Sequence, residues 1–364
     1  MLASDSIFYI QEFIQEKKAA SRSPVKISSK VGGYSNGKGG NNNDRKLFHD
    51  TLRLLFHSGI KPSYCVPTSP NGINWLEVPK PVSVYGANLP IDRLDRKRIQ
   101  LDNIIQPIIE IIEYLQHKKT NIRIVEFCAG SGSVALPLSF MYPSIKFVFI
   151  DNKERSLLIA QKRSKYAELQ NTNFTLGNIE DYMDAFDIGV GLHACGNASD
   201  IIIQKCIAAR AFLVVCPCCV GKVNLSNNKK PRSFVFEKII GGINSSDDLY
   251  HNLIKAADIG HGGDADEGGV DSPDTRLRML SKCYVEEAPT YSLTHSPTYP
   301  LTHSLTQDRR LFISENGYQA FLFKMNPVSC TPKNDILVGI PEEMPYIPML
   351  EPIADIFDTS ILLD

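Results

Sequence analysis

The chain has 364 residues, which is enough for one large domain with extensions or for two domains. Its hydrophobic fraction of 43% and its charged fraction of 22% are ordinary for a globular protein. A formal net charge of −1 excludes an overall field that attracts nucleic acid or an anionic membrane, and leaves only a local basic patch for such contacts. No stretch approaches the roughly 18 uninterrupted apolar residues that a membrane-spanning helix needs.

The N-terminus and the cysteines bear on the cellular compartment. Asp5 and Glu12 lie near the start, and no basic segment precedes an apolar core there, so we expect neither a secretory signal nor a transit peptide. The chain has 9 cysteines, an odd number, and four of them crowd into residues 206–219. This spacing does not match an extracellular disulfide framework. We therefore expect a cytoplasmic protein with reduced thiols and no membrane contact.

The first part of the chain lacks the pattern of a packed domain. Apolar residues at helical spacing predict short helices over 1–20 and 46–57. The intervening segment 21–45 is rich in glycine and asparagine, which is typical of a flexible linker. A proline-rich, irregular segment follows over 61–95. We assign residues 1–74 to an N-terminal region of short helices and flexible linker.

A different pattern begins near residue 96. Helical periodicity over 96–116 is interrupted by Pro107, where we expect a kink or break. Beyond it, short β-branched segments alternate with helical ones. Strands are predicted over 123–127, 145–150, 174–176, 187–192 and 212–216, with helices from about 133, over 154–169 and over 200–209. Strands separated by helices of this length form a parallel sheet that helices cover on both faces.

The C-terminal part ends the predicted domain. Residues 290–306 hold two near-copies of a Leu-Thr-His-Ser phrase, which predicts a low-complexity, disordered insertion. Two apolar runs, 310–314 and 318–325, flank Asn316-Gly317, and Asn-Gly between such runs is a strong hairpin signal.

The predicted fold class is therefore α/β. We expect a Rossmann-like sheet of the class I methyltransferase type with a terminal antiparallel hairpin and helices on both faces. The domain is predicted to span residues 75–340, and residues 341–364 form a C-terminal tail.

A nucleotide site is predicted where the first strand ends. The strand runs into Cys-Ala-Gly130-Ser-Gly132, and the two glycines let the backbone turn tightly and approach a ligand closely. Asp151 ends the next strand about 20 residues later, where a carboxylate can bind both ribose hydroxyls.

Glu126 bears on which nucleotide binds. The run from Gly130 to Ala135 also fits the dinucleotide fingerprint, so an NAD-dependent oxidoreductase is one hypothesis. A carboxylate at Glu126 suits the ammonium and sulfonium groups of S-adenosylmethionine and is awkward beside a pyrophosphate. The alternative is that Glu126 only caps the following helix. We favour S-adenosylmethionine as the cofactor.

The third strand supplies the adenine end of the predicted site. Asn178 is placed to hydrogen-bond the adenine and Ile179 to pack on its ring, the alternative being that Asn178 caps the next turn. The predicted cofactor-binding residues are Glu126, Cys128, Ala129, Gly130, Gly132, Asp151, Asn152, Asn178, Ile179 and His193.

Catalytic groups are sought after strands four and five, since ligands of open α/β sheets lie outside the carboxyl ends of the strands. His193 is the candidate general base for a hydroxyl or amine acceptor, because imidazole titrates nearest neutral pH. The alternative is a histidine that only anchors a backbone carbonyl. Ser199 or Asp200 is expected to cap the helix that follows.

Cysteines near His193 raise a zinc hypothesis. Cys216-Pro-Cys218-Cys219 and His193-Ala-Cys195 supply ligand types that zinc accepts, but zinc ligands usually come in two clean pairs spaced by two to four residues. We therefore predict no metal. Cys195 before a helix also has the position of a low-pKa thiol, and a cysteine nucleophile is the weaker hypothesis.

Basic clusters over 93–98, 162–165 and 229–232 are candidate phosphate contacts, although such runs are more often solvated helix faces.

These motifs together resemble a known family. The runs Val125–Gly132, Asp151–Glu154, Leu192–Gly196 and Cys216–Cys219 resemble the methyltransferase-like part of the glutathione S-transferase C-terminal domain-containing proteins, over about residues 75–340. The His-x-Cys-Gly motif is also distantly similar to the tRNA 2′-O-methyltransferases of the acceptor stem. The resemblance implies a class I fold that uses S-adenosylmethionine, with RNA as the leading acceptor.

Two hypotheses follow for the function. The first is an S-adenosylmethionine-dependent methyltransferase. The alternative is a non-catalytic protein that binds S-adenosylmethionine or a partner with the same fold, because the loop after strand four lacks the Asp/Asn-Pro-Pro-aromatic sequence of amino-methylating enzymes. No transferase-like helical domain is recognisable ahead of residue 75, so we expect no glutathione chemistry.

Overall fold

The computed structural model describes residues 73–87, 90–218, 230–241, 250, 254, 299–326, 330–331 and 334–344. The predicted helices over 1–20 and 46–57, the linker between them and nearly all of the C-terminal tail lie outside these residues.

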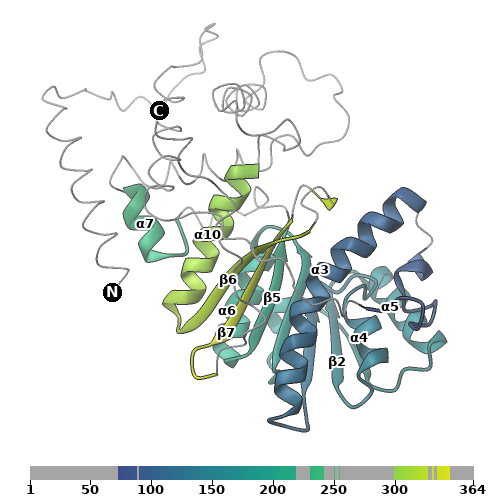
Figure 1. Cartoon of the computed structure of the whole chain (residues 1–364). Coiled ribbons are helices and arrows are strands. Elements are labelled where there is room, and N and C mark those ends of the chain that lie inside the picture. The colour runs from purple at the N-terminus through teal and green to yellow at the C-terminus, as the bar shows by residue number, and fades with distance from the viewer. Residues whose placement is uncertain are drawn as a thin grey trace, which may run out of the picture.

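A sheet of seven strands forms the centre of the molecule, in the order β3-β2-β1-β4-β5-β7-β6 (Figure 1). Its strands are β1 Arg123–Phe127, β2 Lys146–Asp151, β3 Thr172–Leu176, β4 Ile188–Ala194, β5 Phe212–Pro217, β6 Tyr318–Lys324 and β7 Asp335–Pro341. Strands β1 to β5 pair in parallel, and β7 pairs antiparallel with both β5 and β6. This arrangement confirms the predicted α/β sheet of the class I methyltransferase type.

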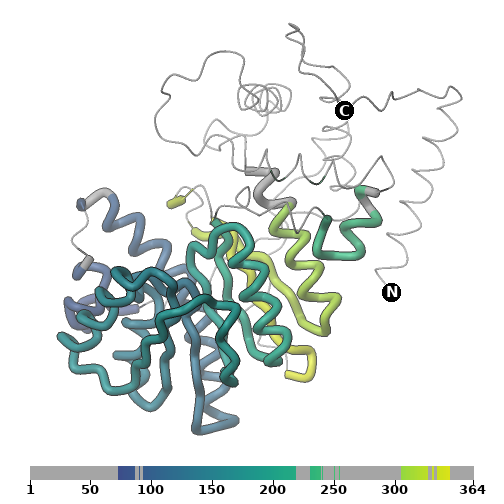
Figure 2. The backbone as a smooth tube through the Cα atoms, turned by 180° about the vertical axis from the view of Figure 1, so that it is seen from behind, coloured from purple at the N-terminus to yellow at the C-terminus, as the bar shows by residue number. Residues whose placement is uncertain are grey.

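Helices cover both faces of the sheet, as Figure 2 shows from behind. They are α3 Ile91–Gln116, α4 Ala135–Met141, α5 Glu154–Tyr166, α6 Asn197–Ala209, α7 Phe234–Gly241 and α10 Tyr299–Glu315, with short 3-10 helices at Val84–Ala87 and Ile179–Asp181. Buried side chains of α3, α4 and α5 share one core cluster, and those of α6 and α10 share another. Alternate strand residues face the two clusters, Ile124 the first and Val125 the second.

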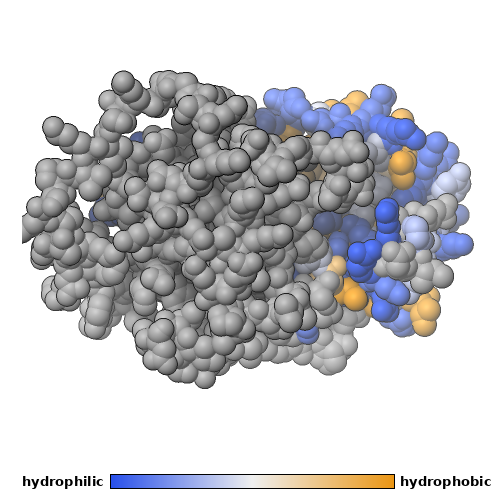
Figure 3. All heavy atoms as spheres, turned by 90° about the horizontal axis from the view of Figure 1, so that it is seen from above, coloured by the Kyte–Doolittle hydropathy of each residue, from blue (hydrophilic) through white to orange (hydrophobic). Residues whose placement is uncertain are grey.

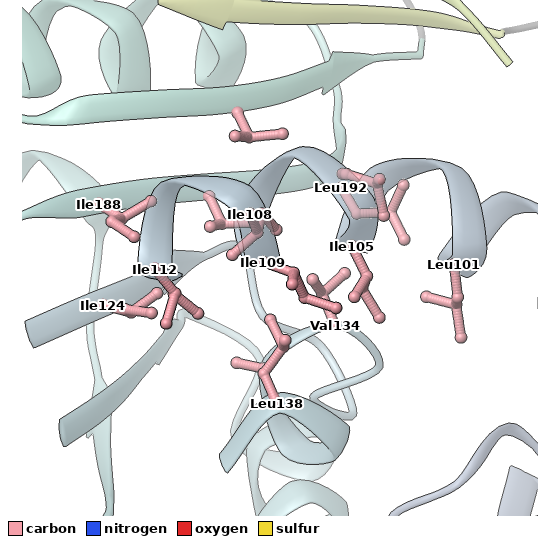
Figure 4. Close-up of a cluster of buried hydrophobic side chains, with 14 of the residues drawn as sticks. Leu101, Ile105, Ile108, Ile109, Ile112, Ile124, Val134, Leu138, Ile188 and Leu192 are labelled. Atoms are coloured by element: carbon pink, nitrogen blue, oxygen red, sulfur yellow. The ribbon is translucent and has the colours of Figure 1, made fainter. Parts of the chain in front are cut away.

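Helix α3 lies across one face of the sheet. Ile105, Ile108, Ile109 and Ile112 of this helix approach side chains of the strands and of α4 (Figure 4). The helix continues through Pro107, so of the predicted kink or break the break is wrong. Burial of this isoleucine face against the sheet stabilises the helix more than the lost backbone hydrogen bond destabilises it.

The predicted hairpin at Asn316-Gly317 is also wrong. The run 310–314 belongs to α10, and the turn joins this helix to β6. The amide of Gly317 donates to the Ser314 carbonyl, and Gly317 has φ +75°. A left-handed glycine ends a helix as readily as it turns a hairpin, so the same signal fits both. The antiparallel pair consists of β6 and β7, whose register runs from Tyr318↔Pro341 to Lys324↔Asp335.

The prediction of a disordered insertion over 290–306 is wrong for its last residues. Helix α10 begins at Tyr299 and so includes the second copy of the Leu-Thr-His-Ser phrase. Leu305 and Thr306 in its second turn are fully buried. Residues 290–298 lie outside the described part of the chain.

The described surface visible from above is mostly hydrophilic, and its hydrophobic side chains are scattered among polar ones (Figure 3). Within the described ranges, none of the helices combines the length and the apolar character needed to cross a membrane.

Candidate functional site

A cavity of about 580 Å³ lies at the carboxyl ends of the parallel strands. This volume is within the range of small-molecule sites, roughly 300–1,000 Å³. Nine of the ten predicted cofactor residues line it, and Gly132 does not: the nine are Glu126, Cys128, Ala129, Gly130, Asp151, Asn152, Asn178, Ile179 and His193. The structure therefore brings together residues at the carboxyl ends of β1, β2, β3 and β4 and in the loops that follow them.

The two glycines of the loop after β1 have different surroundings. Both have left-handed backbones, with φ +55° at Gly130 and +72° at Gly132. A Cβ atom added at Gly130 meets nothing within 4 Å, whereas one at Gly132 lies 2.9 Å from Leu136 and 3.0 Å from Phe149. Gly130 thus borders open space at the cavity, and Gly132 allows the loop to pack on the core.

Asp151 holds the glycine loop in place. Its carboxylate accepts hydrogen bonds from the amide of Gly130 at 2.7 Å and from the amide of Lys153 at 2.8 Å. The side chain is nearly buried, yet it borders the cavity. A carboxylate fixed by two backbone donors at this edge of the sheet keeps acceptor capacity for hydroxyl groups of a ligand.

Glu126 is buried at the end of β1 and does cap the next helix. Its two carboxylate oxygens accept the amides of Val134 at 3.3 Å and of Ala135 at 3.0 Å. Burial raises the pKa of Glu126 to about 7, although these two amides and the charges of Lys97 and Arg163 act in the opposite direction. The alternative that Glu126 caps the following helix is therefore confirmed by these two hydrogen bonds. It is compatible with a role in binding, because the carboxylate also lines the cavity.

Lys97 lines the same end of the cavity and was missed as a site residue. It stands in α3, and burial lowers its pKa while the nearby Glu126 raises it. Its only sequence signal was membership of the basic run 93–98. An ammonium beside a carboxylate in one cavity matches the two charges of an amino-acid group.

The loop after β3 provides the other end of the cavity. Ile179 is buried and Asn178 is exposed, and both line the cavity. The Asn178 side chain makes no capping hydrogen bond to the 3-10 helix that follows, so the capping alternative is wrong. Instead, its Oδ1 accepts from Nδ2 of Asn152 at 3.5 Å, which joins the ends of β2 and β3.

His193 stands at an irregularity of β4. The register with β5 shifts between Leu192 and Ala194, and His193 has φ +58°, which is strained for a residue other than glycine. Its side chain is exposed and lines the cavity. A bulge of this kind turns a side chain away from the regular face of the strand, and here it turns the imidazole toward the cavity.

Ser199 and Asp200 do not cap α6, contrary to expectation. The helix begins at Asn197 with no side-chain capping bond. The Ser199 hydroxyl donates to the Ala194 carbonyl. Asp200 accepts hydrogen bonds from Arg309 of α10 and from Arg232, both at 2.8 Å. A polar residue in the first turn of a helix has the sequence signature of a cap, and its long-range partners cannot be read from the sequence.

The cysteines around the site do not form a metal centre among the described residues, where no group of three or more His, Cys, Asp or Glu side chains has the required arrangement. Cys195 lines the cavity, and Cys216 is fully buried and donates to the Asp335 carbonyl. Burial raises the pKa of Cys128 to about 11. Cys219 lies outside the described part of the chain.

Arg163 was expected on a solvated or phosphate-binding helix face, together with its neighbours over 162–165. Instead, its guanidinium is partly buried and donates to the carbonyls of Pro81, Ser131 and Ser83 at 2.8, 2.6 and 3.1 Å. This side chain therefore fastens the glycine loop to the segment ahead of α3.

Comparison with known proteins matches the same part of the chain. A family model described as a methyltransferase domain matches residues 96–226. The glutathione S-transferase C-terminal domain-containing protein homolog of Drosophila melanogaster is 34% identical over 292 residues, 79% of this chain and 43% of the relative. The human protein of that name is 33% identical over 293 residues, 80% of this chain and 40% of the relative. The chain spans less than half the length of these relatives.

Solved structures include magnesium protoporphyrin IX methyltransferase of Synechocystis with bound SAH, at 13% identity and a TM-score of 0.39, covering 71% of this chain and 91% of that one. A methyltransferase-domain family model thus matches part of this chain, and the chain is similar to the glutathione S-transferase C-terminal domain-containing proteins that its motifs resemble.

Proposed function

We propose that the chain binds S-adenosylmethionine and transfers its methyl group to RNA. The observation that carries the first part is the order of the cavity-lining residues across the sheet. Ile179 follows β3, Asp151 ends β2, Glu126 lies in β1 and His193 in β4, and these strands are neighbours in that order. An extended ligand across these strand ends meets an apolar wall, a carboxylate, a charged pair and an imidazole in turn.

This sequence of groups fits the parts of S-adenosylmethionine. The adenine would pack on Ile179 beside Asn178, and the ribose hydroxyls would donate to Asp151. The amino-acid end would place its carboxylate near Lys97 and its ammonium near Glu126. Such a match of opposite charges inside a partly desolvated cavity is stronger than the same contacts in water. A pyrophosphate would face the buried carboxylate of Glu126, which disfavours the NAD-dependent alternative.

His193 is the group that we assign to proton transfer. When bound, the cofactor would supply a methyl group on a sulfonium, from which a neutral thioether is a good leaving group. The protein then has to align the acceptor oxygen and accept its proton. The imidazole of His193 is exposed toward the cavity from a strained backbone, as expected of a side chain held for such a task.

RNA is proposed as the acceptor on the likeness of the His-x-Cys-Gly motif and on the charge near the cavity. Helix α3 carries Lys97 into the cavity, and Arg93 and Arg96 in the first turns of that helix are exposed. Guanidinium groups suit phosphate contacts, and those contacts position a nucleic acid without reading its sequence.

Calorimetric titration with S-adenosylmethionine and S-adenosylhomocysteine tests the cofactor. We expect micromolar binding of both and much weaker binding of NAD. Absence of binding by either sulfur nucleoside would refute the proposal, and preferential binding of NAD would revive the oxidoreductase hypothesis.

Transfer of labelled methyl groups to separated RNA and protein fractions of a cell extract tests the reaction. Label in RNA that is lost with His193→Ala supports the proposal, whereas label in protein alone contradicts the acceptor. Binding without transfer to either fraction would favour the non-catalytic alternative, for which the lack of an Asp/Asn-Pro-Pro-aromatic sequence in the β4 loop is the motivating observation.

A further inference from the structure

Two thiols meet on the wall of the cavity. The Sγ atoms of Cys195 and Cys218 lie 2.8 Å apart, although the residues are separated by 23 positions in the chain. Cys195 follows β4 and Cys218 follows β5, and these strands are parallel neighbours. We propose that Cys195 and Cys218 form a reversible disulfide, which makes this pair a site of redox modification.

The sheet brings the two residues together. Pairing of β4 with β5 continues to Leu192↔Cys216 and Ala194↔Pro217, so the next residue of each strand emerges beside the other. A disulfide has a sulfur–sulfur bond of about 2.05 Å, so the two atoms need to approach by less than about 1 Å. Backbone hydrogen bonding between β4 and β5 thus provides most of the proximity.

Exposure sets the order of the chemical steps. Cys195 is exposed and Cys218 is buried, so a small-molecule disulfide RSSR reaches Cys195 first. The Cys195 thiolate attacks one sulfur of RSSR, which forms a mixed disulfide and releases the first RSH. The Cys218 thiolate then attacks Sγ of Cys195 and displaces the second RSH. Two electrons pass from the two cysteines to RSSR, and the two thiol protons end on the two RSH molecules.

Neighbouring cysteines are poorer partners for Cys195. Burial and the charge of Asp151 raise the pKa of Cys128 to about 11, so its sulfur stays protonated at neutral pH and is a weak nucleophile. Cys206 and Cys216 are fully buried in the two core clusters. Cys330 is also buried, and its thiol contacts Sδ of Met325 at 3.9 Å. The geometry therefore favours one pairing among the described cysteines.

The bond would change the environment of His193. In the reduced protein, Sγ of Cys195 donates to the His193 carbonyl at 3.4 Å. A disulfide lacks that hydrogen and ties the loop after β4 to the end of β5. A molecule in the cavity covers Cys195, since this residue is part of its lining. This last point, shielding by the nucleoside, rests on the proposed function, whereas the disulfide itself does not.

Mass spectrometry of the full chain tests the pairing directly. Hydroxyethyl disulfide serves as the oxidant, followed by acid quenching, alkylation and trypsin. The tryptic peptide 166–205 carries Cys195 as its single cysteine, and the peptide 211–222 carries Cys216, Cys218 and Cys219. We expect these peptides to be linked in the monomer, and dithiothreitol to separate them. Linkage should persist in Cys219→Ser and disappear in Cys218→Ser.

Two outcomes would overturn the site. Cys195 of the unaltered chain remaining as a mixed disulfide with the reagent would show that Cys218 does not reach it. Linkage that persists in Cys218→Ser and is lost in Cys219→Ser would show that Cys195 bonds to Cys219 and not to Cys218. The unaltered chain gives the first result without any substitution, so a folding defect of a variant cannot obscure it.

A second arm separates the disulfide from the cofactor assignment. With saturating S-adenosylhomocysteine, we expect linkage to form at least fivefold more slowly, because the nucleoside covers Cys195. Linkage at an equal rate with and without the nucleoside would leave the disulfide site standing and would count against the cofactor assignment. Absence of linkage under both conditions would refute the disulfide and leave the cofactor assignment to calorimetry.

Discussion

The guanidinium of Arg163 donates to the backbone carbonyl of Ser131 at 2.6 Å, which ties α5 to the glycine loop of the candidate site. The same group also donates to the carbonyls of Pro81 and Ser83. Five donors in a planar fork allow one arginine to satisfy three carbonyls from two separate segments. The loop between Gly130 and Gly132 is thus held by Arg163 at the Ser131 carbonyl and by Asp151 at the Gly130 amide.

Substitution of Arg163 should therefore loosen the site without touching a ligand. We expect Arg163→Ala to weaken S-adenosylhomocysteine binding about tenfold and to lower the free energy of unfolding by about 1–3 kcal/mol, because three partly buried carbonyls lose their donor. Arg163→Lys should retain only part of the affinity and of the stability, since an ammonium cannot reproduce the planar set of donors of a guanidinium. Calorimetry and urea unfolding measure the two effects, and Arg155→Ala, on the same helix, is the control. Unchanged affinity in Arg163→Ala would contradict the positioning role.

Asp151 is expected to matter both for the ligand and for the loop. Asp151→Ala removes the acceptor for the amides of Gly130 and Lys153 together with the proposed ribose contact. We expect at least a tenfold loss of S-adenosylhomocysteine affinity. Asp151→Asn keeps one acceptor oxygen and should fold more stably than Asp151→Ala while still binding weakly. The exposed Asp184→Ala, measured by the same calorimetry, should behave as the unaltered chain. Full affinity in both Asp151 variants would exclude the ribose assignment.

The pH dependence of ligand binding should report the titration of Glu126. Burial raises its pKa to about 7, so the carboxyl is largely protonated at pH 6 and ionised at pH 8. A ligand ammonium favours the ionised form, so affinity should rise by up to about tenfold per pH unit below 7 and level off above it. Calorimetry between pH 5.5 and 7.5 avoids the titration of the ligand's own amine near pH 8.

Glu126→Gln provides the comparison for that profile. The amide keeps an acceptor for the amide of Ala135 but does not titrate, so its affinity should be lower and independent of pH. A steep profile in Glu126→Gln would assign the titration to another group. The stability of the protein should change with pH in the direction opposite to ligand affinity. The raised pKa means that the folded state binds the proton more tightly than the unfolded state, so the contribution of Glu126 to the unfolding free energy should fall from pH 4.5 to about 7.

Sequence reasoning succeeded where a pattern is local. Short apolar strands, a glycine turn and an acidic residue at a strand end are each contained in a few residues, so the parallel sheet and the cavity lining around Gly130 and Asp151 were predictable. Lys97 and Arg163 were missed because their significance depends on contacts with distant segments. The hairpin prediction at Asn316-Gly317 failed for another reason, since a left-handed glycine occurs both at a helix end and in a hairpin turn.

A buried ion pair connects α6, whose first turns border the cavity, to α10. Arg309 of α10 donates to Asp200 of α6 across 109 positions, and both side chains are almost fully buried. Arg309→Ala removes one of the two guanidinium partners of the buried Asp200 and leaves Arg232 at 2.8 Å, so the variant should lower the unfolding free energy by about 1–3 kcal/mol. Lys119→Ala breaks the more exposed pair with Asp187 and should lower it by less than about 1 kcal/mol. Urea unfolding of both variants tests the contrast, and equal effects would contradict it.

The two loop glycines offer a matched pair of substitutions with opposite expected effects. Both have left-handed backbones, so alanine at either position carries a strain of about 1 kcal/mol. Only at Gly132 does the added methyl group also meet the core, at 2.9 Å from Leu136. Gly132→Ala should therefore lower the unfolding free energy by a further 1–3 kcal/mol or so. At Gly130 the methyl group enters open space beside the cavity, where a ligand approaches the backbone closely.

Gly130→Ala should consequently weaken S-adenosylhomocysteine binding at least tenfold with the smaller loss of stability, whereas Gly132→Ala should lose more stability and, where it still folds, retain more affinity. Urea unfolding and calorimetry on the same preparations compare the two variants, with Gly177→Ala, whose added Cβ also meets nothing within 4 Å, as a control for a methyl group elsewhere on the cavity wall. Loss of affinity that follows the loss of stability in both variants would mean that Gly130 serves the fold alone. Loss of affinity confined to Gly130→Ala would place the ligand against the first glycine of the loop.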